Sequence, residues 1–215
     1  RKAIIEARKK VAQAIEAKQH EIYFTSCDSE SDNLAIKGVS YANKNKGKHI
    51  ITSKIEHPAV LNTCKTLEQQ GFEVTYLNVD EDGFVDLQEL VNSIKPTTIL
   101  ITIMFANNEI GTIEPIEEIG KIAHKKGIVF HTDCVQAIGN VRLNVNELNI
   151  DLLSMSAHKF YGPKGIGALY IREGIEVEKI QDGGHQERDK RAGTENVAEI
   201  VGLGEAIDEI YKNYD

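Results

Sequence analysis

Two side chains with complementary chemistry follow consecutive predicted strands in the second half of the chain. Asp133 lies in the segment His-Thr-Asp-Cys-Val-Gln, and Lys159 ends the segment Ser-Met-Ser-Ala-His-Lys. Most lysines are solvated surface groups, but a lysine held at a strand end can form a Schiff base with an aldehyde cofactor. An acid opposite it can keep a pyridine nitrogen protonated, which makes the ring an electron sink. The pair therefore predicts covalent cofactor chemistry in one crevice.

Polar side chains also follow three other predicted strands. Ser29 and Asp32 have the spacing of a capping box, so we predict a helix N-terminus there, which is a ready site for an anion. His57 stands beside Pro58, which suits the first turn of a helix, and Asn108 belongs to a polar loop. Taken singly, these residues are as typical of ordinary caps and turns as of a ligand site.

The elements that must position these residues alternate along the whole chain. Short β-branched runs alternate with helical patterns, which is typical of βαβ units and a mostly parallel sheet. The predicted strands are 22–25, 49–53, 73–77, 98–104, 128–132, 152–156 and 167–171, and the predicted helices include 30–43, 58–70, 86–93 and 116–126. The last two strands are joined by a Gly- and Pro-rich stretch too short for a helical crossover, so the last strand is predicted to be antiparallel.

This pattern predicts an α/β fold, a three-layer sandwich around a mostly parallel seven-stranded sheet. In open sheets of this kind, ligands bind outside the carboxyl ends of the strands. No linker, internal repeat or shift in composition divides the chain, so residues 1–215 are predicted to form one domain. Both ends fall within helical patterns, and residues 1–17 carry a helical stripe formed by Ile4, Ile5, Arg8, Val11, Ala12 and Ile15. We therefore expect the sequence to be a segment of a longer protein.

The composition excludes two classes of partner. With 25 Lys and Arg against 33 Asp and Glu, the formal net charge is −8, and no basic stripe is present that could neutralise a phosphate backbone. Nucleic acid is therefore not an expected partner. The longest apolar stretch, residues 97–106, is about half of the ~20 residues that a transmembrane helix needs, so no membrane span is expected.

The three cysteines do not form a recognisable pattern. Cys27, Cys64 and Cys134 are an odd number and are widely spaced, which fits neither a disulfide framework nor a structural zinc site. We predict no metal site, and we interpret the cysteines as small, partly buried residues of a reduced, cytoplasmic protein.

Several segments taken together resemble the cysteine desulfurases of the class V aminotransferase superfamily. They are HTDCVQAIG, SAHKFYGPKGIGALY and RAGTENV, strengthened by NNEIG and IEHPAVL. The resemblance covers essentially the whole chain. It implies the large, cofactor-binding domain of a pyridoxal 5′-phosphate (PLP) enzyme in residues 1–215, without the N-terminal segment and the C-terminal small domain.

The resemblance also implies a role for individual residues. Lys159 would bond to PLP and later shuttle a proton, and Asp133 would pair with the pyridine nitrogen. His57 would stack on the ring face and assist proton transfer, while Gln136 and Asn108 would hold the phenolic oxygen.

A second group of residues would hold the cofactor phosphate. Ser29, Ser156 and His158 would do so within one chain, and Thr194 would complete the cup from the partner subunit of a homodimer. The family reads close to Ser-Gly-Ala-Thr-Glu where this chain has Ser-Cys-Asp-Ser-Glu at 26–30. We therefore expect Asp28 to weaken PLP binding, because two like unit charges ~5 Å apart repel by roughly 3 kcal/mol at an effective dielectric of ~20.

The implied reaction converts L-cysteine to L-alanine and leaves the sulfur on an enzyme cysteine. From there it passes to an acceptor or scaffold protein for iron–sulfur cluster assembly or thio-modification. In the family, the nucleophilic cysteine and the arginine that clamps the substrate carboxylate lie beyond the position of Asp215, so we expect residues 1–215 alone to be inactive in sulfur transfer. Two alternatives remain open: another class V enzyme such as a selenocysteine lyase, and a catalytically incomplete domain for dimerisation or docking.

Overall fold

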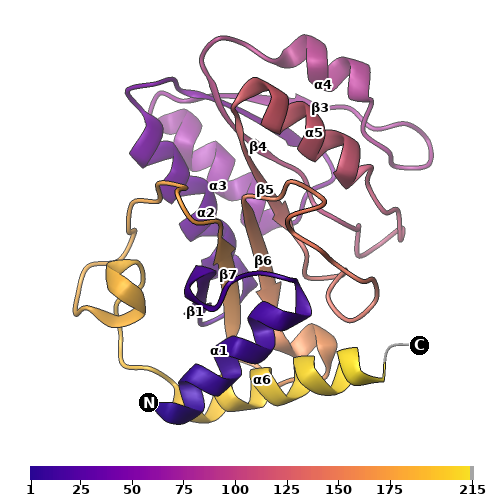
Figure 1. Cartoon of the computed structure of the whole chain (residues 1–215). Coiled ribbons are helices and arrows are strands. Elements are labelled where there is room, and N and C mark those ends of the chain that lie inside the picture. The colour runs from indigo at the N-terminus through magenta and orange to yellow at the C-terminus, as the bar shows by residue number, and fades with distance from the viewer. Residues whose placement is uncertain (214–215) are drawn as a thin grey trace.

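A seven-stranded sheet forms the centre of the structure. The computed structural model describes residues 1–213, and the strand order in that range is β1-β7-β6-β5-β4-β2-β3 (Figure 1). The strands are β1 (Ile22–Thr25), β2 (His49–Ser53), β3 (Glu73–Leu77), β4 (Thr98–Thr102), β5 (Val129–Asp133), β6 (Leu152–Ser156) and β7 (Gly167–Ile171). Four pairs are parallel, and β7 is antiparallel to both of its neighbours, β1 and β6. The predicted mostly parallel sheet with an antiparallel last strand is confirmed.

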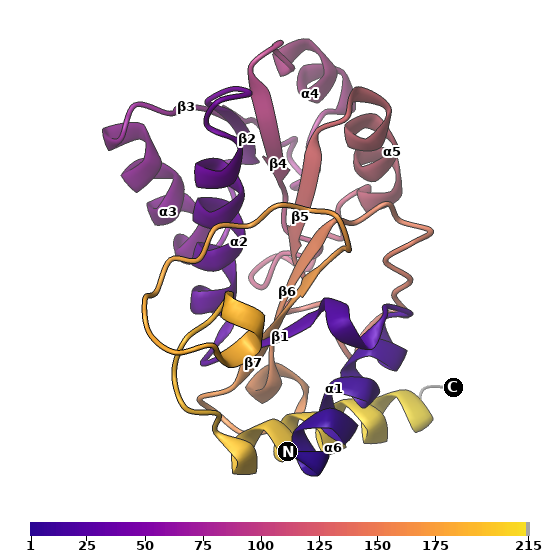
Figure 2. The same cartoon turned by 60° about the vertical axis from the view of Figure 1, so that its left-hand side comes forward.

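Helices cover both faces of this sheet and complete the predicted three layers. The α-helices are α1 (Lys2–Ala14), α2 (Asp28–Asn43), α3 (Pro58–Gln69), α4 (Leu87–Ser93), α5 (Ile116–Lys126) and α6 (Val197–Lys212), and the 3-10 turns are η1 (Gln19–Glu21), η2 (Ala157–Phe160) and η3 (Gln186–Asp189). One apolar cluster joins α2 and α3 to the sheet, and a second joins α1, α5 and α6 to it. In Figures 1 and 2, α1 and α6 lie side by side.

Within residues 1–213, none of the helices is long and apolar enough to cross a lipid bilayer.

The fourth predicted strand was two residues too long, for a structural reason. The β4 ladder stops at Thr102, but the next residues still follow β5: the Ile103 N–H donates to the His131 carbonyl and the Phe105 N–H to the Asp133 carbonyl. The apolar run therefore continues past the regular strand. It carries the chain over the carboxyl end of β5 and into the cavity described below.

One charged residue, Arg8, lies in the buried stripe of α1. Its guanidinium donates to both carboxylate oxygens of Glu187 and to the Ile22 carbonyl, each at 2.6 Å. Glu187 also accepts the Phe24 N–H at 2.8 Å. These bonds join α1, β1 and η3. Ile5, predicted on the same stripe, is instead 46% exposed.

This ion pair predicts a large loss of stability when Arg8 is removed. Arg8→Ala should lower the free energy of unfolding by about 3–5 kcal/mol, because Glu187 would remain buried without its counter-charge. Urea unfolding of the purified chain measures the effect. The double variant Arg8→Met, Glu187→Gln should recover most of the loss, since it leaves no buried charge.

A matched control is Lys10→Ala, which removes a partly exposed ion pair with Glu205 from the same helix. It should cost about 1 kcal/mol or less. An Arg8→Ala variant as stable as Lys10→Ala would contradict the importance of the buried pair.

Candidate active site

A cavity of about 280 Å³ opens at the carboxyl ends of the central strands. Seven of the nine residues predicted from the sequence line it: Ser29, His57, Asn108, Asp133, Gln136, His158 and Lys159. The remaining lining residues are Cys27, Asp28, Met104, Ala106 and Val135. The parallel topology brings these residues together, because it ends several strands at the same edge of the sheet.

The other two predicted residues lie outside this lining. Ser156, the last residue of β6, is buried, and its hydroxyl lies 2.9 Å from Nδ1 of His158. It can therefore orient the His158 ring from below. Thr194 is exposed and lines a separate cavity of about 170 Å³ with Ser26 and Arg191.

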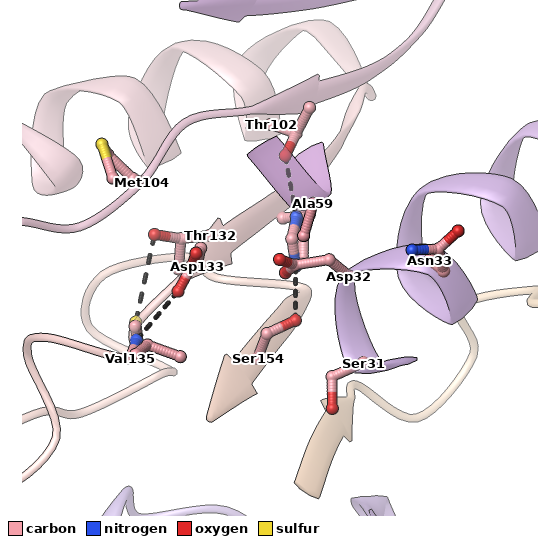
Figure 3. A network of polar contacts seen from close by, with 12 residues as sticks. Ser31, Asp32, Asn33, Ala59, Thr102, Met104, Thr132, Asp133, Val135 and Ser154 are labelled. Atoms are coloured by element: carbon pink, nitrogen blue, oxygen red, sulfur yellow. Dashed lines mark hydrogen bonds and ion pairs between the residues drawn. The ribbon is translucent and has the colours of Figure 1, made fainter. Parts of the chain in front are cut away.

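Asp133 is a buried acid on the cavity wall. It ends β5 and is 5% exposed, and its Oδ1 accepts the Val135 N–H at 2.9 Å (Figure 3). Burial raises the pKa of Asp133, whereas the Val135 N–H and the nearby His57 and Lys159 lower it. The charge of this cavity acid therefore depends on the ionisable groups around it.

Lys159 reaches the cavity from η2, directly after β6. The Ala157 N–H donates to the Ile166 carbonyl and Ala157 in turn accepts the Gly162 N–H, which closes a tight turn. A Cβ at Gly162 would lie 2.9 Å from the Ala157 carbonyl oxygen, so the turn requires glycine. This turn leaves His158 and Lys159 exposed on the cavity side.

His57 is fixed by the start of α3. It is the N-cap residue, and its Nδ1 accepts the Ala59 N–H at 3.2 Å, with Pro58 in the first turn as predicted. With Nδ1 accepting, the proton of the neutral ring lies on Nε2. His57 can therefore present an N–H donor while its backbone opens the helix.

Of the two neighbouring asparagines, only Asn108 lines the cavity. Asn107 is committed to the loop: its Oδ1 accepts the N–H groups of Glu109 and Ile110, and its Nδ2 donates to the Ile55 carbonyl. The sequence places two amides side by side, and the fold separates their roles.

The predicted capping box at Ser29 and Asp32 was wrong. Helix α2 begins at Asp28 with Cys27 as N-cap, and no side chain caps it; Glu30 instead accepts the Ser26 N–H at 2.7 Å. Because the helix starts before Ser29, Asp32 falls one turn inside it and faces the sheet. The box pattern was a coincidence of spacing.

Asp32 belongs to a buried polar network beneath Asp133. His131 is held between the hydroxyls of Thr102 and Ser154, at 2.8 and 2.9 Å. Asp32 points toward the space between these hydroxyls in Figure 3. Its Oδ1 is 3.6 Å from Nε2 of His131. Burial lowers the pKa of His131 to about 3, so the ring is neutral and the contact is not an ion pair at neutral pH.

A second buried acid, Glu56, was also missed by sequence reasoning. Its Oε1 accepts the Ser53 hydroxyl at 2.7 Å and the Met104 N–H at 2.9 Å, which ties the end of β2 to the chain after β4. Burial raises the pKa of Glu56 to about 8. Its position beside His57 was the only signal in the sequence, and it does not indicate burial.

Asp28 turns inward rather than away from the cavity. It is 9% exposed, at the first position of α2. Burial and the neighbouring Asp133 raise the pKa of Asp28 to about 8, against the opposing effect of Lys159. The cavity floor therefore carries an acid where the family motif has alanine.

The three cysteines are free thiols in different surroundings. Cys64 in α3 and Cys134 after β5 are fully buried, and burial raises the pKa of both thiols, that of Cys64 to about 12. Cys27 is partly buried on the cavity wall. The predicted burial of the cysteines is confirmed.

The known proteins whose sequences resemble this chain point to one family. The chain is 60% identical over 213 residues to the cysteine desulfurase IscS of Clostridium botulinum (strain Hall), covering 99% of this chain and 54% of the relative. It is 64% identical over 206 residues to the cysteine desulfurase IscS of Methanosarcina thermophila, covering 96% and 51%. The chain thus spans about half the length of the curated relatives it matches.

Solved structures of similar fold support the same family. A NifS-like protein superposes with a TM-score of 0.95 at 43% identity, covering 98% of this chain and 58% of that one. The structure described as SspA in complex with cysteine gives a TM-score of 0.93 at 47% identity, covering 96% and 60%. The predicted resemblance is confirmed. Because the model of the class-V aminotransferase family also matches residues 1–215 without a gap at either end, the chain belongs to the class-V aminotransferase family.

Proposed function

We propose that the chain is the cofactor-binding domain of a PLP-dependent cysteine desulfurase, which converts L-cysteine to L-alanine and passes the sulfur to an enzyme cysteine. The observation that carries the proposal is that Asp133 and Lys159, from the ends of β5 and β6, line one cavity. The names of the relatives, and the cysteine bound to one structural neighbour, support the sulfur substrate.

The residues of the cavity fit PLP. A volume of about 280 Å³ is close to the lower end of the ~300–1,000 Å³ range of small-ligand sites. The cavity offers an amine in Lys159, a buried acid in Asp133 and amide groups in Asn108 and Gln136. When bound, PLP supplies an electron sink for the chemistry of an amino acid. The one feature that opposes the fit is the carboxyl group of Asp28.

Each cavity residue then has a proposed task. Lys159 bonds to the cofactor and moves a proton, and Asp133 holds a proton on the pyridine nitrogen. His57 presents Nε2–H at the ring face, while Asn108 and Gln136 orient the ring through its phenolic oxygen. Because the acid and the amine come from adjacent strands, their separation is fixed by the sheet.

The phosphate group is proposed to lie near the start of α2. Ser29 and His158 face the cavity there, and Ser156 orients His158 through its 2.9 Å contact. The N–H groups of the first turn of a 16-residue helix also favour an anion. Thr194 lies on a different surface of its own chain, which agrees with a role in the cup of a partner subunit.

We also propose the cellular compartment of the enzyme and the pathway that it serves. The three free thiols agree with a reducing compartment such as the cytoplasm. The names of the relatives support a role in supplying sulfur for iron–sulfur cluster assembly, through an acceptor or scaffold protein.

The proposal predicts that Lys159 carries the cofactor. After incubation with PLP, borohydride reduction and peptide mass mapping should find the pyridoxyl group on Lys159, and Lys159→Ala should remove it. Lys164→Ala is the matched control, because Lys164 follows the same turn but does not line the cavity. A principal adduct on Lys164 or Lys125 would refute the assignment.

A homodimer is predicted for the PLP-loaded protein, because the family completes its phosphate cup from the partner subunit. Sedimentation equilibrium at micromolar concentration should give twice the chain mass of 23.9 kDa. Thr194→Val should weaken PLP binding without changing the fold. A monomeric protein whose PLP affinity is unchanged by Thr194→Val would argue against the shared cup.

The 215-residue chain by itself is predicted not to release alanine from L-cysteine at an enzymatic rate. A thiolate held at attack distance can supply ~7–11 kcal/mol of the barrier. Cys64 and Cys134 are buried, and Cys27 lies at the proposed phosphate end. The assay is alanine formation with PLP and a reductant present, with the full-length IscS of Clostridium botulinum as the positive control. Turnover by the chain near the control rate that is lost in Cys27→Ser would show that Cys27 is a nucleophile and overturn the prediction.

A further inference from the structure

Three aspartates, two from α2 and one from β5, line the cavity or lie buried next to it. Asp28 and Asp32 lie one helical turn apart on α2, and a carboxylate oxygen of each lies within 4.8 Å of the other and of a ring nitrogen of His57. Asp133 lines the same cavity as Asp28. Buried acids this close cannot all be ionised at neutral pH, because each charge raises the cost of the next.

The hydrogen bonds show which of the three is best suited to carry the charge. Asp133 accepts the Val135 N–H, whereas Oδ1 of Asp28 and both carboxylate oxygens of Asp32 are buried and accept no hydrogen bond from the described residues. An unpartnered buried carboxyl group is more stable when protonated. Asp133 is therefore the best suited of the three to be the anion, whereas burial favours the protonated forms of Asp28 and Asp32.

Asp28 is the member of this cluster that meets the ligand space. Asp32 is fully enclosed, whereas Asp28 lines the cavity. The ionisable groups around Asp28 come from four elements: Asp32 from α2, His57 from the start of α3, Asp133 from β5 and Lys159 from η2. Its charge therefore acts on the same space as the proposed cofactor.

We propose that Asp28 is a titrating acid on the cavity floor, and that its charge determines how tightly the cavity holds a phosphate-bearing pyridine cofactor. The inference rests on the proposed function, since it concerns the same cavity. Protonated Asp28 is neutral, like the alanine of the family motif. Ionised Asp28 adds a negative charge beside the start of α2, where the phosphate is proposed to lie.

The direction of the pH dependence follows from the pKa of Asp28, which burial and Asp133 raise to about 8. Below that value the carboxyl is neutral, and above it the carboxyl is an anion. The phosphate favours the protonated form, so PLP affinity contributed by this group is present at low pH and is lost as the pH rises through about 8. Replacement by the neutral isostere Asn should remove this dependence.

The test is a PLP titration of the purified 215-residue chain, followed by the absorbance of the lysine-bound cofactor, at about pH 6.5 and about pH 9.5. Lys159 is present in every variant, so the measured quantity is the affinity of the wild type divided by that of Asp28→Asn at each pH. This ratio should fall by roughly tenfold between the two conditions, which corresponds to a coupling of one pKa unit. Circular dichroism checks that both proteins are folded.

Two controls separate the charge of Asp28 from other effects. Asp82→Asn makes the same chemical change at an exposed residue outside the cavity lining. The PLP affinity of the wild type divided by that of Asp82→Asn should therefore not change with pH. Pyridoxal without phosphate should show a smaller change than PLP. An equal change for pyridoxal would overturn the assignment of the effect to the phosphate.

The outcomes also distinguish this inference from the proposed function. If the wild type and Asp28→Asn both bind PLP at Lys159 with the same pH dependence, the inference fails and the proposed function stands. If neither binds PLP at either pH while both are folded, the proposed function fails and the inference fails with it.

Discussion

The burial of carboxyl groups beneath the carboxyl edge of the parallel sheet is the constraint on which the site depends. A buried acid must be hydrogen-bonded, neutralised by a cation or protonated. Asp133 has a backbone N–H and the nearby Lys159, and Glu56 has a hydroxyl and a backbone N–H on Oε1 but an unpartnered Oε2. Asp28 and Asp32 also have unpartnered buried oxygens. Burial raises the pKa of all four carboxyl groups, and their hydrogen-bond partners and neighbouring charges oppose or add to that effect.

The same bonds hold the strand ends in position. Glu56 joins the end of β2 to the segment after β4, and the neutral ring of His131 bridges β4 and β6 through two hydroxyls. Because His131 lies two residues before Asp133, this bridge also fixes the end of β5. Polar groups that never reach the cavity thus set the distance between the acid on β5 and the lysine after β6.

Asp28, which departs from the family motif, lies among these buried acids. At the start of α2, Asp28 adds a carboxyl group to a cavity that Asp133 also lines, one helical turn away from the buried Asp32. Asp28 is 9% exposed and lines the cavity, so its side chain does not turn away into solvent. Burial and the neighbouring Asp133 raise the pKa of Asp28, which favours its neutral form.

Much of the fold and the cavity could be predicted from the sequence. Strand and helix periodicity predicted the seven strands, and the short Gly- and Pro-rich return predicted that β7 runs antiparallel. Seven of nine predicted site residues line one cavity, because residues that follow parallel strands are forced to one edge of the sheet.

Other features were decided only by the tertiary structure. The burial of Glu56 and Asp32, the inward turn of Asp28 and the pairing of Arg8 with Glu187 could not be predicted from local patterns. Each depends on a partner or a neighbouring surface from another part of the chain; Arg8 and Glu187, for example, are 179 positions apart in the sequence. Local sequence determines which elements form and where they end, whereas the charge of a side chain depends on the dielectric and the partners that distant segments bring to it.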